Sequence, residues 1–349
     1  MPESTALPAA DRDRLRHHGD VDVSPGMLDF AVNVQGSGPP DWLRERLAAR
    51  LGELGRYPSA ADESAARAAV AARHGRAPEE VLLLGGGAEG FAMLPRLAPR
   101  LAAVVHPSFT EPELALREAG VAVARVLLEP PYALDPALVP AEADLVVLGN
   151  PTNPTSVLHP AETLYALRRP GRIVVIDEAF ADAIPGEPQS VAAQSLPDVL
   201  VLRSLTKTWA LAGLRCGYLL GPPALLTRLS HGRAHWPLGT LQLEAIAATA
   251  DPAALGESRS RAVDIAAERA VMIERLRGLG IEVCEPAHGP FVLIRVPDGE
   301  LLRKRLADKA IAVRRCDTFP GLGPDHLRLA VRGAAEVDRL VAAIRSSGL

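Results

Sequence analysis

The chain has 349 residues, with 38 Lys and Arg against 42 Asp and Glu, which gives a formal net charge of −4. Hydrophobic residues make up 48% and charged residues 23%, a balance that is typical of a folded globular protein and excludes a largely disordered chain. The slightly acidic charge is spread along the sequence, so we expect neither a nucleic-acid surface nor an anionic-membrane surface. The length predicts about two domains.

The three cysteines, Cys216, Cys284 and Cys316, are too few and too far apart for a disulfide framework or a zinc site. No apolar run approaches the roughly 18–20 residues that a membrane span needs. Residues 1–10 lack the apolar segment of a signal peptide and are expected to form a loose terminus. We therefore expect a cytoplasmic protein without a bound metal.

Short apolar runs alternate with helix-patterned stretches through most of the chain up to residue 220. Most of these runs are apolar on both faces, which is typical of strands in a sheet that helices cover on both sides. Alternating strands and helices predict an α/β fold with a mostly parallel sheet. The seven expected strands cover residues 81–84, 102–106, 121–127, 143–148, 172–176, 199–202 and 216–220.

Glycines end several of the expected helices, for example after residues 62–74 and 111–119. Beyond Gly221 the pattern changes to helices, the longest over residues 257–279, and then to a mixed α+β tail. We expect three parts. Residues 1–39 form an N-terminal arm that joins the small domain, residues 40–255 form a large α/β domain, and residues 256–349 form a small C-terminal α+β domain.

The segment GGGAEG at residues 85–90 follows an expected strand and begins an expected helix. It matches the G-x-G-x-x-G pattern of dinucleotide-binding loops, whose glycines let the backbone approach a phosphate. A dinucleotide site also needs an acidic residue about 20 positions further on, whereas the next strand ends at His106. We interpret the segment as a phosphate-binding loop at a helix N-terminus, and a plain strand-to-helix turn is the alternative.

Four further segments combine polar or charged residues with strand ends, where ligands bind in open α/β sheets. Each has a plain alternative: a turn at Asn150, a surface lysine at Lys207, a helix cap at Asp177, or a structural ion pair at Arg215. Together, and in this order, they predict a catalytic site. The segments are GNPTNPT at 149–155, IVVIDEAF at 173–180, SLTKTW at 204–209 and LAGLRCGY at 211–218.

The motifs N-P-x-N-P-T at 150–155, D-E-A-F at 177–180 and S-x-T-K-x-x-x-L-A-G-L-R-x-G-Y at 204–218 resemble those of fold-type I pyridoxal-phosphate enzymes, the aspartate aminotransferase-like superfamily. Within it, the chain most resembles histidinol-phosphate aminotransferases and threonine-phosphate decarboxylases, from about residue 17 to the C-terminus. The resemblance implies the pyridoxal-phosphate-dependent transferase fold, pyridoxal 5′-phosphate as the cofactor, and a homodimer with shared active sites.

The resemblance also implies roles for individual residues. Lys207 would form the Schiff base with the cofactor, Asp177 would pair with the pyridine nitrogen, and Asn153 would bond the ring oxygen O3′. Phe180 and Ser156 depart from the family, because many relatives have tyrosine and glycine there. The other implied cofactor contacts are Gly87, Ala88, Glu89, Ser204 and Arg215 around the phosphate, the stacking ring Phe109, Phe180, and Tyr57 from the neighbouring subunit.

On the substrate side, Arg328 matches the arginine that binds an α-carboxylate. A second cationic group would bind a substrate phosphate, and Arg332, Arg315 and His18 are the candidates, each with a solvated surface cation as the alternative. On one strand, Arg328 and Arg332 would face the same way because their spacing is even. Asn33, in the segment LDFAVN at 28–33, is also expected to contact the substrate.

The same cofactor supports transamination and decarboxylation, so spacing alone leaves the reaction open. The segments HHGD at 17–20, LDFAVN at 28–33 and RCDTFPGL at 315–322 resemble threonine-phosphate decarboxylases of cobalamin synthesis. The leading hypothesis is therefore decarboxylation of a small phosphorylated amino acid, and the alternative is a histidinol-phosphate type aminotransferase that uses a 2-oxo acid. A nicotinamide oxidoreductase is disfavoured by His106, and an inactive homologue by the presence of Lys207 and Asp177.

Overall fold

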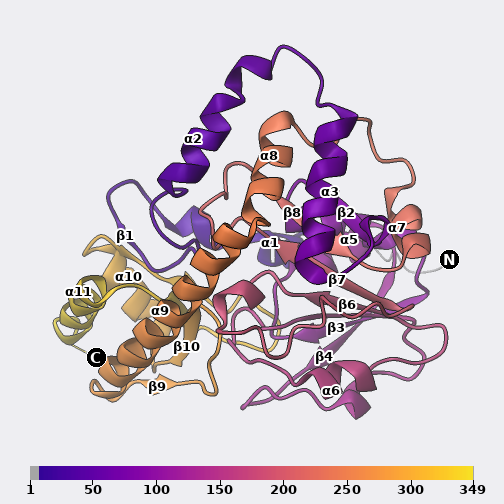
Figure 1. Ribbon diagram of the computed structural model, residues 1–349. Coiled ribbons are helices and arrows are strands. Elements are labelled where there is room, and N and C mark those ends of the chain that lie inside the picture. Colours follow the sequence, from indigo (N-terminus) through magenta and orange to yellow (C-terminus); the bar gives the residue numbers. More distant parts are fainter. Residues whose placement is uncertain (1–7, 349) are drawn as a thin grey trace.

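The computed structural model describes residues 8–348, and its central element is a seven-stranded sheet of order β2-β8-β7-β6-β5-β3-β4 (Figure 1). Only β8 runs antiparallel to its neighbours, so the prediction of a mostly parallel seven-stranded sheet is confirmed. The strands are β2 (Val81–Leu84), β3 (Leu101–His106), β4 (Ala122–Leu127), β5 (Leu145–Gly149), β6 (Ile173–Asp177), β7 (Val199–Ser204) and β8 (Gly217–Leu220).

Helices cover both faces of this sheet. Along β5, Val146 joins the apolar cluster on one face and Val147 joins the cluster on the other, because successive side chains of a strand point in opposite directions. The first cluster includes side chains of α3 (Ala60–His74), α6 (Ala161–Ala166) and α8 (Thr240–Thr249). The second includes side chains of α4 (Gly87–Met93), α5 (Glu111–Glu118) and α7 (Pro223–Ser230).

The C-terminal part contains an antiparallel four-stranded sheet of order β12-β13-β10-β9. Its strands are β9 (Glu282–Val283), β10 (Phe291–Arg295), β12 (Arg314–Arg315) and β13 (His326–Ala330), and α10 (Gly299–Ala307), α11 (Ala334–Arg345) and the end of α9 (Pro252–Arg277) pack against them. The long helix α9 runs from beside α8 to this sheet (Figure 1).

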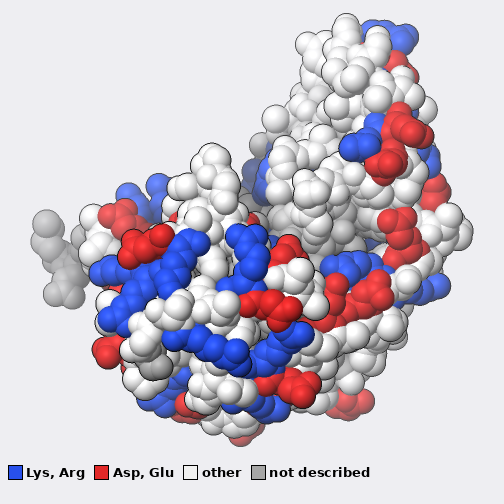
Figure 2. All heavy atoms as spheres, turned by 90° about the vertical axis from the view of Figure 1, so that its left-hand side faces the viewer, with Lys and Arg blue, Asp and Glu red and all other residues white. Residues whose placement is uncertain are grey.

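The N-terminal segment is attached to the C-terminal part, because β1 (Leu28–Asp29) pairs in parallel with β11 (Ile311–Ala312). The domain boundaries at residues 39 and 255 stay a prediction. Figure 2 shows Lys and Arg interspersed with Asp and Glu on the face toward the small sheet. The projection at the top, which α2 (Asp41–Ala49) and the start of α3 form in Figure 1, is largely uncharged in that view.

The start of the chain differs from the expected loose terminus. Residues 9 and 10 of that segment begin a helix, α1 (Ala9–Arg16), while residues 1–7 lie outside the described residues. The helix is held by tertiary contacts, since Arg16 pairs with Glu118 of α5 at 3.0 Å and the Thr110 hydroxyl donates to the carbonyl of Leu15. Within residues 8–348, no helix is long and apolar enough to cross a membrane.

Candidate active site

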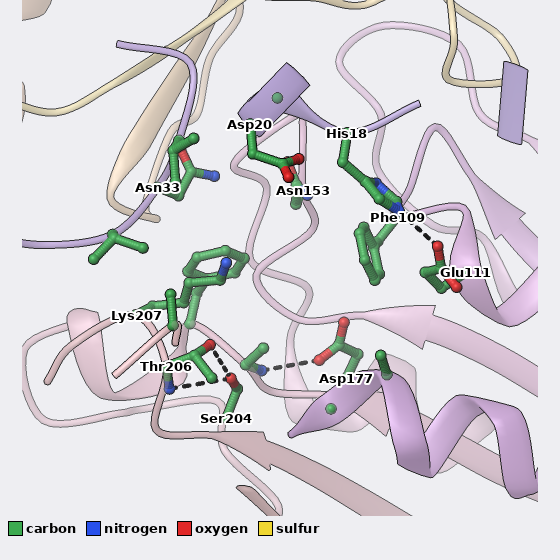
Figure 3. A pocket seen from close by; sticks show the side chains of 18 of the residues that line it. His18, Asp20, Asn33, Phe109, Glu111, Asn153, Asp177, Ser204, Thr206 and Lys207 are labelled. Carbon is green, nitrogen blue, oxygen red and sulfur yellow. Dashed lines mark hydrogen bonds and ion pairs between the residues drawn. The ribbon is translucent and has the colours of Figure 1, made fainter. Parts of the chain in front are cut away.

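A cavity of about 500 Å³ lies at the carboxyl ends of the parallel strands (Figure 3). Asp177 ends β6, Asn153 follows β5 and Lys207 follows β7, and these three strands are neighbours in the sheet. Parallel neighbours end at the same edge, which explains why residues far apart in the sequence meet here. The predicted residues that line the cavity are His18, Asn33, Gly87, Ala88, Phe109, Asn153, Asp177, Phe180, Ser204, Lys207, Arg215 and Arg328.

Asp177 and Glu178 point to opposite sides of the backbone. One carboxylate oxygen of Asp177 accepts the N–H of Ala179 at 3.0 Å, and burial raises the pKa of this carboxyl to about 7. Glu178 turns away from the cavity and pairs with Arg203 at 2.9 Å. In residues 8–348, Asp177 has no ion-pair partner, so its carboxyl is available to a ligand that would stabilise the ionised form.

Lys207 is buried in a cationic environment. Burial, followed by Arg328 and then Arg215, lowers the pKa of its amine to about 8, against the opposing effect of Asp177. At pH 7 about a tenth of this amine is therefore unprotonated. The unprotonated amine is the form that attacks carbonyl compounds. The backbone carbonyl of Lys207 is fixed by the N–H of Gln35 at 3.0 Å.

The turn between β2 and α4 lies against a guanidinium group. Gly86 has a φ of +90°, and a Cβ at this position would lie 2.8 Å from Nη2 of Arg215. The positive φ favours glycine here, and a side chain would also push the Arg215 guanidinium aside. Gly87 and Ala88, which follow it, line the cavity with Arg215.

Glu89 is the first correction to the predicted site. It does not line the cavity, and its backbone N–H donates to the carbonyl of Gly86 at 3.2 Å. Its carboxylate accepts from the N–H of Gly85 and from Nε of Arg233 at 2.8 Å. Glu89 therefore braces the turn from outside, so a phosphate contact from this residue is not supported.

Thr206 lines the cavity, although the sequence analysis did not single it out. Its hydroxyl lies 2.7 Å from the hydroxyl of Ser204, so the two form a polar pair beside Lys207 (Figure 3). The S-x-T-K motif at residues 204–207 could have predicted this pair, because it places two hydroxyl residues, separated by one residue, just before the lysine.

Arg314 is the second residue that sequence reasoning missed. It is buried, lines the cavity, and donates through Nη2 to the carbonyl of His17 at 2.7 Å and to the hydroxyl of Thr318 at 2.8 Å. Its Nη1 has no hydrogen-bond partner in the described part of the chain. Arg315, one of the three candidates for binding a substrate phosphate, instead pairs with Asp317 outside the cavity lining.

Arg328 reaches the cavity from β13. Its Nη1 donates to Oδ1 of Asn153 at 2.7 Å, and its Nη2 donates to the carbonyl of Ala31. Burial lowers the pKa of both Arg314 and Arg328, and neither has a carboxylate partner among residues 8–348. The two guanidinium groups therefore form a cationic site in the cavity.

Arg332 is the third correction, because it does not share the cavity with Arg328. It lies two residues beyond the end of β13, so strand alternation no longer sets its direction. Its guanidinium donates to the backbone carbonyls of Asp29 at 2.9 Å, Val32 at 2.7 Å and Val34 at 3.2 Å. These contacts hold the N-terminal segment and leave no substrate role for Arg332.

His18 and Asn33 bring the N-terminal segment to the cavity. Nε2 of His18 lies 2.5 Å from a carboxylate oxygen of Glu111, and its ring is 5.4 Å from that of Phe109. Asn33 is buried, and its Oδ1 has no partner in residues 8–348. Glu111 and Asp20, which also line the cavity, were not predicted (Figure 3).

Tyr57 lies outside this cavity. Its side chain is exposed and stacks on Trp236, with ring centroids 4.2 Å apart. A contribution from Tyr57 to the site of a second subunit stays a prediction. Phe180, in contrast, lines the cavity and packs edge-on against Phe291 at 5.0 Å.

Comparison with known proteins connects this geometry to a family. The family model described as aminotransferase class I and II matches residues 25–344. A protein named histidinol-phosphate aminotransferase from Mycobacterium tuberculosis is 60% identical over 329 residues, which cover 94% of this chain and 90% of that protein. The threonine-phosphate decarboxylase of Salmonella typhimurium is 32% identical over 342 residues, covering 93% and 92%.

The fold comparison agrees. The crystal structure of the histidinol-phosphate aminotransferase from Clostridium acetobutylicum has a TM-score of 0.84 at 24% identity, covering 92% of this chain and 98% of that one. The chain belongs to the aminotransferase class I and II family, and it is an enzyme that uses pyridoxal phosphate.

Proposed function

We propose that the chain is an aminotransferase of the histidinol-phosphate type, which moves an amino group between a small phosphorylated amine and a 2-oxo acid. The observation that carries this proposal is the pair of buried arginines, Arg314 and Arg328, in the cavity that Lys207 lines. Both substrates of such a reaction are anionic, as a phosphate ester or as a dicarboxylic acid. Guanidinium groups bind either anion through paired hydrogen bonds.

The residues of the cavity fit pyridoxal phosphate. Asp177 offers a buried carboxylate without an ion-pair partner among the described residues, which suits the protonated ring nitrogen. When bound, the cofactor supplies an electron sink for the electrons released at the substrate Cα. Lys207, whose amine has a pKa lowered to about 8, would hold the cofactor covalently and, as a free amine, would move the proton at Cα.

The phosphate of the cofactor would lie where the β2–α4 turn meets Arg215. The hydroxyls of Ser204 and Thr206 and the backbone of Gly87 and Ala88 line this end of the cavity. Backbone N–H groups at the start of a helix and a guanidinium group are suited to a dianion. Phe109 would stack on the ring, and Asn153 would donate to the ring oxygen through its amide N–H groups.

The remaining polar groups would bind the substrate. Arg328 and Arg314 would hold its phosphate or carboxylates, and Asn33 has a buried oxygen that could accept a hydrogen bond from the substrate. His18 reaches the same cavity with Glu111 as its partner. The substrate would therefore be enclosed between the N-terminal segment and the small sheet.

Threonine-phosphate decarboxylation is the second candidate. It is supported by the relative in Salmonella typhimurium and by the presence of two arginines, because threonine phosphate carries both a carboxylate and a phosphate. The local motifs made decarboxylation the leading hypothesis in the sequence. The 60% identity to a protein named histidinol-phosphate aminotransferase instead favours transamination. The decarboxylase is therefore the reaction to test against.

We also infer that the active enzyme is a homodimer. The segment between α2 and α3, together with Trp236, on which Tyr57 stacks, carries large apolar side chains that are exposed in the single chain, namely Leu51, Leu54, Tyr57 and Trp236. Such a patch marks a surface that another protein covers. A second copy of the chain would bury these side chains and bring Tyr57 to the cavity of its partner.

One product assay separates the two reactions. The purified enzyme with pyridoxal phosphate is supplied with histidinol phosphate and 2-oxoglutarate, or with threonine phosphate alone. The proposal predicts glutamate from the first mixture and no carbon dioxide from the second. Carbon dioxide from threonine phosphate without any 2-oxo acid would instead establish the decarboxylase. Lys207→Ala is the control, and it should abolish both the reaction and the covalent attachment of the cofactor.

A further inference from the structure

The loop after β5 is joined to the small sheet twice, by the Asn153–Arg328 hydrogen bond to β13 and by a second contact near the start of β10. Asn153 lies in the loop after β5, and three residues later this loop contains Ser156, which is fully buried. The hydroxyl of Ser156 accepts the N–H of Gly289 at 2.7 Å. Its backbone carbonyl accepts the N–H of His288 at 2.8 Å. Both partners lie just before β10 of the small sheet.

The backbone conformation of Ser156 is unusual for its residue type. Its φ of +66° lies in the left-handed region, which residues other than glycine, asparagine and aspartate rarely adopt. Glycine would fit the backbone without strain, but it would lack the hydroxyl that Gly289 requires. A non-glycine residue in such a conformation persists only where the surroundings fix it, and such residues cluster at functional sites.

The loop that Ser156 holds leads directly to the substrate side of the cavity. Phe291, two residues after Gly289, packs edge-on against Phe180 at 5.0 Å, and the guanidinium of Arg328 lies 5.6 Å from its ring centroid. From the other side, Nη1 of Arg269 in α9 donates to the carbonyls of His288 at 2.8 Å and Gly289 at 3.1 Å. The loop is therefore clamped between Ser156 and α9.

We propose that Ser156 is a positioning residue, which fixes the small sheet against the loop after β5 and so sets Arg328 in its place opposite Asn153. The inference rests on the proposed function in one respect, that Arg328 binds the anionic group of the substrate. Ser156 does not line the cavity, so we expect it to contact neither cofactor nor substrate directly. Its effect passes through Gly289 and Phe291 to Arg328.

Two variants separate the hydroxyl from the backbone conformation. Ser156→Gly removes the hydroxyl and relieves the left-handed strain, whereas Ser156→Ala removes the hydroxyl and keeps the strain. Arg269→Met removes the other clamp on the same loop without touching the cavity. If Ser156 acts as proposed, all three variants raise KM for the phosphorylated substrate about tenfold and change kcat much less, since one charge-binding contact is misplaced.

Two further readouts do not depend on the reaction. Hydrogen exchange of the full-length enzyme should be faster at the amides of residues 288–291 in Ser156→Gly than in the wild type. Calorimetric titration with inorganic phosphate should show weaker binding in all three variants, while the visible spectrum of the bound cofactor stays as in the wild type. These results support the inference even if the enzyme proves to be a decarboxylase.

The inference is overturned by either of two results. In the first, Ser156→Gly leaves KM, phosphate affinity and amide exchange unchanged. In the second, KM is unchanged and activity falls only in step with loss of bound cofactor or of thermal stability, which is the behaviour of a purely structural residue.

Discussion

Arg314 and Arg328 lie directly opposite each other on the antiparallel strands β12 and β13, and both line the cavity beside Lys207. Like charges in directly opposed positions destabilise a sheet. Neither guanidinium has a carboxylate partner in the described part of the chain, and Nη1 of Arg314 has no hydrogen-bond partner there. An anionic substrate would relieve this repulsion, which links the local cost in stability to the proposed function.

The first prediction concerns Arg314. Arg314→Gln should raise KM for the phosphorylated substrate about 10- to 100-fold, because one hydrogen-bonded charge contact is lost, while kcat changes much less. Arg315→Gln is the matched control, since the neighbouring side chain pairs with Asp317 outside the cavity lining. Steady-state kinetics of both variants test this, and equal losses in the two would contradict a substrate role for Arg314.

The second prediction separates Arg332 from the substrate. Arg332→Ala should lower the free energy of unfolding by about 1–3 kcal/mol, because it leaves partly buried backbone carbonyls of Asp29, Val32 and Val34 without their hydrogen-bond donor. At a temperature where the variant is folded, KM should stay within about twofold of the wild type. Urea titration measures the stability, and Arg345→Ala, an exposed arginine of α11, is the control. A stable variant with a raised KM would restore the sequence-based role.

The sequence was sufficient to predict the large sheet. Its strands are continuous apolar runs, so β2 spans the expected residues 81–84 and the other strands agree within a few residues. The site residues at the ends of β5, β6 and β7 were also predictable. Each is a polar or charged residue that interrupts an apolar run, and parallel strands place such interruptions at one edge.

The small sheet was harder to predict, because its contacts depend on register. Strand β12 is only two residues long, and its pairing with residues near 328 decides which of two consecutive arginines, Arg314 or Arg315, faces the cavity. Arg332 was misplaced for a related reason, since strand β13 ends at Ala330. Helix α1 was missed because contacts with α5 stabilise it rather than an apolar pattern of its own.

The third prediction tests the homodimer and the shared site. Leu54→Glu places a charge in the exposed apolar patch and should yield monomers in analytical ultracentrifugation, with loss of activity. Val263→Glu, which alters an exposed side chain of α9, is the control for an added charge elsewhere on the surface. If Leu54→Glu remains an active dimer, this patch is not the interface.

Mixing two inactive variants tests the role of Tyr57 more directly. A Tyr57→Ala chain keeps its own Lys207, and a Lys207→Ala chain can supply Tyr57 to it. With random mixing, about half of the dimers are hybrids, and one of the two sites in each hybrid is complete. About a quarter of all sites should therefore be complete, which should restore about a quarter of the wild-type activity. The readout is activity after subunit exchange, compared with each variant alone. No recovery would place Tyr57 outside the partner's site.

The last prediction follows from the pKa of Asp177, which burial raises from 3.8 to about 7. Between these values the folded, cofactor-free protein keeps a proton that the unfolded chain has released, so its stability falls as the pH rises through this window. The loss is complete above about pH 7 and absent below about pH 4. Asp177→Asn removes the titrating group and should make the cofactor-free protein a few kcal/mol more stable than the wild type at about pH 8.

This advantage should shrink as the pH falls toward 4, because the wild-type carboxyl becomes neutral as well. Urea titrations at several pH values measure it, with Asp13→Asn, an exposed aspartate of α1, as the control. Saturating pyridoxal phosphate should reverse the order of stability, because the ionised Asp177 gains the protonated ring nitrogen as its partner and ligand binding stabilises the wild type more. An Asp177→Asn protein that binds the cofactor as tightly as the wild type would contradict the assigned role of this carboxylate.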